Sequence, residues 1–127
     1  MKRFATPLSA LFAVILALSS WTAQAGQPYD AKAFAEAQAA GKSILVDVHA
    51  PWCPTCVQQK PIIEGLERAH PALMVFNVDF DTAKDALRQF RVQYQSTLIV
   101  FKGKAEVGRS TGDTDPQAIG ALVAKAL

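Results

Sequence analysis

The chain has 127 residues, half of them hydrophobic, which is enough for one well-filled core and one domain. Its formal net charge is +2 at pH 7, from 13 basic and 11 acidic side chains. Without Lys2 and Arg3 the remaining basic side chains equal the acidic ones in number. Such a balance argues against nucleic acid or an anionic membrane surface as the main partner.

Residues 1–25 are typical of a secretory signal peptide. They begin with positive charge, residues 8–18 are apolar except for one serine, and Ala23-Gln24-Ala25 offers a cleavage site before Gly26. The apolar run is shorter than the roughly 18–20 residues that span a bilayer, although a retained anchor stays an alternative. We therefore expect a domain of residues 26–127, without stable membrane insertion after cleavage, in an exported and disulfide-permissive compartment. A bacterial periplasm fits best.

The rest of the chain alternates between helical and strand patterns. In chain order we expect a helix at 31–40, a buried strand at 43–49, a helix at 54–69, a second buried strand at 73–78, a short helix capped by Thr82, a hairpin of strands 97–101 and 105–109, and a helix that begins at Pro116. Asp30 and Asp115 are suited to cap the first and last helices. This order predicts an α/β fold with a central mixed sheet and helices on both faces.

The only two cysteines lie in the stretch Trp52-Cys53-Pro54-Thr55-Cys56, directly after the strand at 43–49. If Cys53 occupies the first turn of the following helix, unpaired backbone N–H groups and the helix dipole favour its thiolate. A thiolate is the attacking species in disulfide exchange, and Cys56 could then resolve the mixed disulfide. The pattern therefore favours redox chemistry, with Cys53 as nucleophile and Cys56 as resolving thiol.

Three other interpretations of the cysteine pair compete: half a zinc site, a purely structural disulfide, or chance. A structural zinc site needs four ligands, and the only histidines, His49 and His70, match no zinc-finger spacing. A disulfide that closes so small a loop constrains little of the unfolded chain. We therefore expect no metal and no cofactor in the monomer.

These features resemble the thioredoxin superfamily over essentially all of residues 26–127. The strand Ile44-Leu45-Val46-Asp47 followed by Trp52-Cys53 is similar to the family's strand and W-C-x-x-C motif. Pro61 falls where thioredoxins bend their active-site helix, and residues 97–103 are similar to the family's T-L-x-x-F-x-x-G strand and hairpin. The resemblance implies a thioredoxin-like three-layer sandwich that acts as a thiol–disulfide oxidoreductase.

Ser96 departs from the family pattern, because thioredoxins usually carry a cis-proline here, facing the cysteine pair. In the family this loop offers backbone hydrogen bonds to the substrate. A cis bond before a non-proline residue costs about 2.5–4 kcal/mol, so we expect the bond between Gln95 and Ser96 to be trans. The Ser96 hydroxyl could donate toward Cys53 and stabilise its thiolate, or it could merely permit the turn.

Asp47 is a carboxyl within an apolar strand. The family often pairs its buried aspartate with a lysine on the next strand, but Val75 stands at the matching position. We therefore expect the pKa of Asp47 to be raised. Because Cys56 must lose a proton before it attacks, Asp47 could accept that proton through a water. The alternative is that Asp47 is a hydrogen-bonded structural aspartate. His49, two residues later, could influence the chemistry of the site or be only the last residue of the strand.

The resemblance also implies a surface that contacts the substrate, made of Trp52, Pro54, Thr55, Ser96 and Thr97. The sequence resembles exported thioredoxin-like proteins and the C-terminal domain of the transmembrane thiol reductase. It also resembles domains that reduce apocytochrome c before haem attachment. We expect a monomeric reductase or electron shuttle for protein disulfides, recharged by a membrane thiol donor. One alternative is a disulfide-donating oxidase, although the family's strong oxidants commonly carry histidine at the position of Thr55. Another is a binding or dimeric metal-binding module, which Ser96 motivates.

Overall fold

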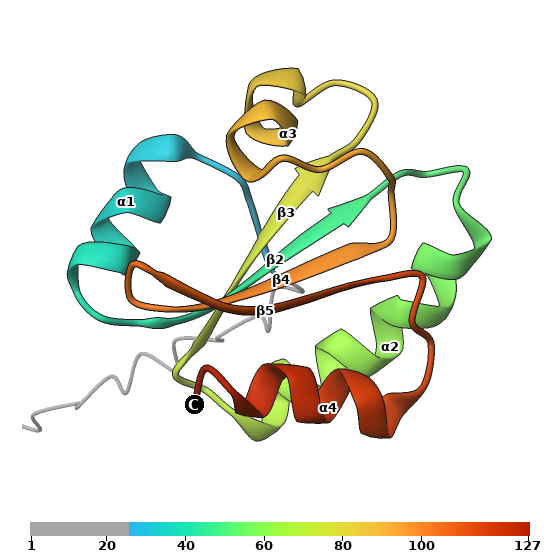
Figure 1. Cartoon of the computed structure of the whole chain (residues 1–127). Coiled ribbons are helices and arrows are strands. Elements are labelled where there is room, and N and C mark those ends of the chain that lie inside the picture. Colours follow the sequence, from blue (N-terminus) through green and yellow to red (C-terminus); the bar gives the residue numbers. More distant parts are fainter. Residues whose placement is uncertain (1–25) are drawn as a thin grey trace, which may run out of the picture.

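The computed structural model describes residues 26–127, so the expected signal peptide lies outside the described residues. The elements in chain order are β1 (Gln27–Pro28), α1 (Ala31–Ala39), β2 (Ser43–His49), α2 (Pro54–Ala69), β3 (Leu73–Asp79), α3 (Lys84–Phe90), β4 (Thr97–Lys102), β5 (Ala105–Thr111) and α4 (Pro116–Ala124) (Figure 1). The boundary expected at residue 25 stays a prediction.

The strands form one mixed sheet in the order β1-β3-β2-β4-β5. The central strand β2 runs parallel to β3 and antiparallel to β4. Figure 1 shows α1 and α3 over one face of this sheet and α2 and α4 over the other. Separate buried clusters lie on the two faces, one around Phe34 and Phe76 and the other around Ile63 and Ile119. The predicted three-layer α/β sandwich is therefore confirmed.

Alternation along β2 decides which side chains face the functional helix. Ile44, Val46 and Val48 pack with α1 and α3, whereas Leu45 belongs to the cluster beneath α2 and α4. Residues two apart in a strand point to the same side, so Asp47 shares the face of Leu45. Both faces are covered, which is why this strand reads as an apolar run interrupted only by that carboxyl.

Two details differ from the sequence-based expectations. The strand β1 was not predicted, because its two residues, which pair with Phe76 and Asn77 of β3, carry no alternating pattern. The assignment of Thr82 as the cap of α3 was wrong, since the N-cap position belongs to Ala83, without a side-chain hydrogen bond. Instead the Asp79 carboxylate accepts the N–H groups of Asp81 and Thr82, at 2.8 and 3.1 Å, in a local turn that delays the helix.

The other two helix caps are confirmed. The Asp30 carboxylate accepts the N–H of Ala33 at 2.8 Å, and the Asp115 carboxylate accepts the N–H of Gln117 at 3.1 Å. The helix α2 continues through Pro61 to Ala69. In the described part of the chain, every helix is too short or too polar to cross a lipid bilayer.

Candidate active site

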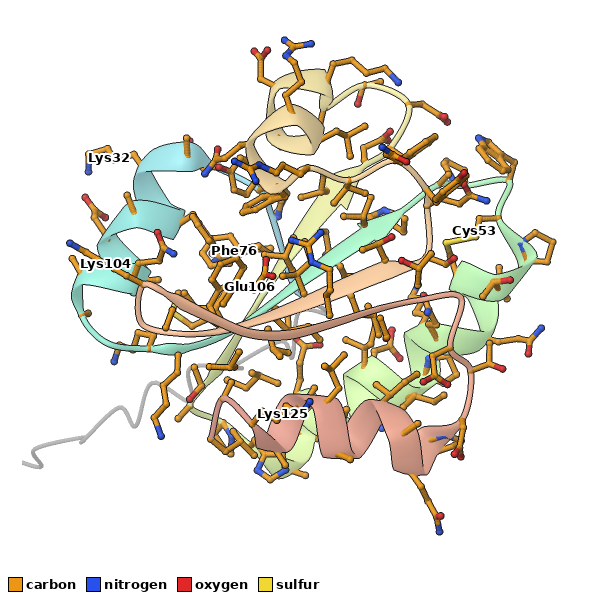
Figure 2. The ribbon with its side chains drawn as sticks, viewed as in Figure 1. Lys32, Cys53, Phe76, Lys104, Glu106 and Lys125 are labelled. Carbon is orange, nitrogen blue, oxygen red and sulfur yellow. A yellow bond between two sulfur atoms is a disulfide. The ribbon has the colours of Figure 1, made fainter. Side chains whose placement is uncertain are left out.

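The cysteine pair lies at the N-terminus of α2, at the end of the sheet to which β2 leads (Figure 2). Cys53 is the N-cap residue, and its sulfur is bonded to that of Cys56 across a Cα–Cα distance of 5.3 Å. The same Cys53 sulfur accepts the N–H of Cys56 at 3.1 Å. Pro54 occupies the first helical turn and has no N–H to offer. A backbone donor aimed at this sulfur stabilises negative charge on it once the disulfide is reduced.

Both cysteines are covered in this oxidised form. Cys53 exposes 1 % of its surface and Cys56 exposes 8 %. Ala50 and Phe80 pack against the pair. Access to the Cys53 sulfur is therefore restricted in this form.

Trp52 forms part of the exposed rim of the site. It is 57 % exposed, and its indole N–H donates to the Asp81 carboxylate at 2.9 Å. Its ring also meets the ring of Phe80 edge-on, with 6.5 Å between centroids. Since Phe80 packs against the cysteines, this contact holds Trp52 beside the disulfide.

A cavity of about 290 Å³ is lined in part by Cys56. Its ionisable lining residues are Asp47, His49, Cys56, Lys60, Glu64 and Glu67. One water needs about 10–15 Å³ of such space, so the cavity has room for several. Asp47 Oδ1 and His49 Nδ1 are buried without a protein hydrogen-bond partner. Within residues 26–127, no three potential metal ligands converge on one point.

Burial raises the pKa of Asp47 to about 6, which confirms the raised value expected from its apolar strand. The charge of His49 opposes this shift, and that of Glu67 adds to it. The pKa of Glu67 is itself raised by burial, against the hydrogen bond that it accepts from the Gly26 N–H. A carboxyl poised near neutral pH, in a cavity that also holds Cys56, is suited to exchange a proton with that thiol.

Ser96 adopts a backbone conformation that is rare for a residue with a side chain. Its φ is 56°, in the left-handed region, and none of the peptide bonds in residues 26–127 is cis. Its hydroxyl donates to the Gln95 carbonyl at 2.6 Å, and its carbonyl accepts the Gly112 N–H at 3.0 Å. The structure thus favours a serine that stabilises the turn over one that donates to Cys53.

The residues expected to contact substrate divide into two groups. Trp52 and Pro54 are exposed and Thr55 is half-buried, whereas Ser96 and Thr97 are buried. The Thr97 hydroxyl is hydrogen-bonded to the Tyr94 carbonyl at 2.8 Å and to the hydroxyl of Thr111 at 2.9 Å. The side chains of Ser96 and Thr97 are therefore not available to a substrate.

The sequence analysis missed Gln59. This residue of α2 is buried, and its amide donates to the carbonyls of Ser96 and Asp113, at 3.2 and 2.8 Å. It joins the helix that carries the cysteines to two loops that are distant in sequence. The available signal was a glutamine between Cys56 and Ile63 on the face that the helix buries.

A cysteine pair that caps a helix at the end of a central strand defines a thiol–disulfide oxidoreductase of thioredoxin fold. The sequence profile of the thioredoxin family matches residues 27–125. The chain belongs to the thioredoxin family, whose members act on protein disulfides.

Individual relatives agree with this assignment. Thioredoxin from Chlamydia trachomatis (serovar D) is 35% identical over 92 residues, which cover 72% of this chain and 89% of that protein. Thioredoxin-1 of Saccharomyces cerevisiae is 32% identical over 94 residues, which cover 74% and 90%. The crystal structure of Trxlp from Edwardsiella tarda EIB202 aligns with a TM-score of 0.73 and 47% identity, over 76% of this chain and 96% of that one.

Replacing the buried carboxyl, Asp47→Asn, should stabilise the oxidised protein at high pH. Because the folded pKa of about 6 exceeds the ordinary value of 3.8, the folded state holds the proton more tightly than the unfolded state. The free energy of unfolding of the wild type should therefore fall as pH rises from about 4 to 6 and stay reduced above that range. Asparagine cannot ionise, so the variant should gain about 1–3 kcal/mol at pH 8 and about a third of that at pH 4.5. Urea unfolding at the two pH values measures this.

The same variant should reduce protein disulfides more slowly at pH 7, by about ten- to hundredfold, if Asp47 accepts the proton of Cys56. An exposed carboxyl on α3, paired with Arg88, provides the control, and Asp85→Asn should change the free energy of unfolding by a similar small amount, less than about 1 kcal/mol, at either pH. An equal stability gain at both pH values would contradict the raised pKa. An unchanged rate would assign Asp47 a structural role.

Proposed function

We propose that this oxidoreductase works in the reductive direction in a bacterial periplasm. The Cys53 thiolate attacks a substrate disulfide, forms a mixed disulfide and expels one substrate thiolate, which takes up a proton. Cys56 then gives up its proton and attacks the Cys53 sulfur, which closes the Cys53–Cys56 disulfide and expels the second substrate sulfur. Two electrons thereby pass from the cysteine pair to the substrate.

The observation that carries this order of attack is the unequal environment of the two sulfurs. Cys53 caps α2 and accepts a backbone N–H, which favours its thiolate. Cys56 instead faces the cavity that holds Asp47. One sulfur is thus suited to attack first, and the other lies beside a group that can remove its proton when the mixed disulfide is resolved.

Two features support reduction over disulfide donation. Thr55 occupies the position at which strong oxidants of the family commonly carry histidine. The described chain also passes directly from α2 to β3 and α3, without the helical insertion that those oxidants have. A disulfide-donating oxidase would use the same two cysteines, so the reduction potential decides between them.

A dithiol used in this direction must be reduced again after each turnover. We assign that step to a membrane thiol carrier that passes electrons to the exported domain, which acts as a monomer. Reduction of the apocytochrome c thiols before haem attachment is one reaction that would consume such electrons.

Export is supported by the pattern of residues 1–25, and cleavage would strengthen a contact at the start of the described chain. The backbone nitrogen of Gly26 donates to Glu67 Oε1 at 2.8 Å. Cleavage before Gly26 would turn this nitrogen into an ammonium that faces a carboxylate, and charge-assisted hydrogen bonds are stronger than neutral ones. The new N-terminus at Gly26 would then form an ion pair with Glu67 of α2.

A second candidate is a binding module in which redox chemistry is secondary. The burial of Cys53, together with Ser96 in place of proline, favours it. Insulin reduction by dithiothreitol separates the two candidates, because a binding module would accelerate the reaction no more than its Cys53→Ser variant does.

Cys56→Ser should accumulate mixed disulfides with protein substrates, because Cys53 can still attack but nothing resolves the product. Non-reducing electrophoresis and mass spectrometry of the periplasmic extract would show these adducts at Cys53. The matched variant Cys53→Ser should form few of them. Adducts of equal amount in both variants would reverse the assignment of nucleophile and resolving thiol.

The midpoint potential of the Cys53–Cys56 couple should lie near that of cytosolic thioredoxin, about −270 mV. Equilibration with glutathione or dithiothreitol buffers, read by mass spectrometry of alkylated thiols, measures it. A value above about −180 mV would make the protein an oxidant and overturn the proposed direction.

The protein released from the periplasm should have the mass of residues 26–127. On this processed form, Glu67→Gln should reduce the free energy of unfolding by roughly 0.5–1 kcal/mol, because it removes the charge that faces the new ammonium. Glu64→Gln, on the same helix, is the control without that contact. A full-length protein in the membrane fraction would refute export by cleavage.

A further inference from the structure

Gln59 is a polar side chain at a position where α2 otherwise buries apolar surface. It exposes 1 % of its area, and its neighbours on the same face of the helix are Cys56 and Ile63. Its amide oxygen Oε1 is buried without a partner. Burying an amide is unfavourable unless hydrogen bonds compensate, so its two donor contacts must account for its place here.

Both hydrogens of the Gln59 amide nitrogen are used. One points to the Ser96 carbonyl at 3.2 Å and the other to the Asp113 carbonyl at 2.8 Å. Ser96 belongs to the segment before β4, and Asp113 to the loop between β5 and α4. The Ser96 carbonyl also accepts the Gly112 N–H, so the two loops and the helix meet at this point.

The backbone of the segment before β4 needs hydrogen bonds from other parts of the chain to keep its conformation. Ser96 has a left-handed backbone, which side chains disfavour, and its own hydroxyl is turned back to Gln95. Because a backbone in this region persists only where its surroundings impose it, the Gln59 and Gly112 donors fix the direction of the Ser96 carbonyl. Gln59 is the side chain among them, and it comes from the helix that carries the cysteines.

This segment also lies at the end of the sheet where substrate must arrive. Thr97 pairs with Val48 at the end of β2, two residues before the turn that leads to Cys53. In Figure 2 Cys53 and the segment before β4 occupy the same end of the sheet. Three of the exposed large apolar side chains in the described chain, Trp52, Val57 and Tyr94, belong to the segments that meet here.

We propose that Gln59 is a positioning residue that sets the affinity of this oxidoreductase for polypeptide disulfides. By holding the Ser96 carbonyl, it orients the backbone of residues 94–96 as a docking edge for the chain that flanks a substrate disulfide. A small disulfide has no flanking chain and gains nothing from this edge. Gln59 therefore favours protein disulfides over small disulfides as substrates. It takes no part in the exchange chemistry of Cys53 and Cys56.

The test compares Gln59→Leu with Gln58→Leu, which alters the adjacent exposed residue of the same helix. Steady-state reduction of insulin, with dithiothreitol as electron source, gives kcat and KM. Reaction of the pre-reduced protein with 5,5′-dithiobis(2-nitrobenzoate) gives the rate with a small disulfide. Gln59→Leu should raise KM for insulin by about tenfold, the factor that one hydrogen bond of ordinary strength represents, with a smaller change in kcat. The small-disulfide rate should fall by less than threefold, and Gln58→Leu should alter neither substrate.

A general disturbance of the active-site helix would affect both substrates alike, so equal losses for insulin and the small disulfide would overturn the proposal. An unchanged KM for insulin would overturn it as well. Gln59→Met provides a second apolar side chain of similar length and should reproduce the split between substrates. If neither variant folds by circular dichroism, Gln59 is needed for folding and the proposed positioning role is wrong. None of these outcomes depends on the cellular compartment or on the direction of the reaction.

Discussion

The central place of β2 in the sheet is the constraint on which the site depends. Its parallel pairing with β3 sets His49 beside Asp79, and its antiparallel pairing with β4 sets Val48 beside Thr97. The end of β2, the end of β3 and the start of β4 therefore meet at one edge of the sheet. Each strand end adjoins a loop of the site. The end of β2 adjoins the turn to Cys53, the end of β3 adjoins the segment of Phe80 and Asp81, and the start of β4 adjoins the segment that ends at Ser96. Hydrogen-bond register thus brings together parts of the chain that are far apart in sequence.

One consequence of this arrangement is that a carboxyl group is buried in an apolar layer, which lowers the stability of the folded protein. Asp47 lies on the face of β2 that packs beneath α2, and burial raises its pKa to about 6. A neutral residue at this position would make the sheet more stable at neutral pH. The fold retains an ionisable group beside a cavity that Cys56 also lines. Such a group is expected where a residue needed for catalysis lowers the stability of the folded protein.

Much of the fold and the centre of the site could be predicted because their signals are local. Apolar runs identified β2 and β3, helix caps identified α1 and α4, and the C-x-x-C spacing identified the redox pair. The missing parts depended on partners distant in sequence. Gln59 reads as an ordinary polar helix residue until Ser96 and Asp113 are placed beside it. The start of α3 was misplaced because the Asp79 carboxylate accepts the N–H groups of Asp81 and Thr82 and holds both residues in a turn before the helix.

The loop before β4 is held here by hydrogen bonds from other parts of the chain and not by a proline ring. A proline restricts its own φ by a covalent ring, and it does so in the unfolded chain too. Ser96 has no such restraint and adopts a left-handed backbone, which costs roughly 1–3 kcal/mol wherever the surroundings impose it. Here the imposing groups are Gln59 and Gly112, which act only in the folded protein. The geometry of this loop is thereby tied to α2, so a movement of that helix when the disulfide opens or closes would reach the Ser96 carbonyl. A proline, whose ring fixes its own φ, would not need that link.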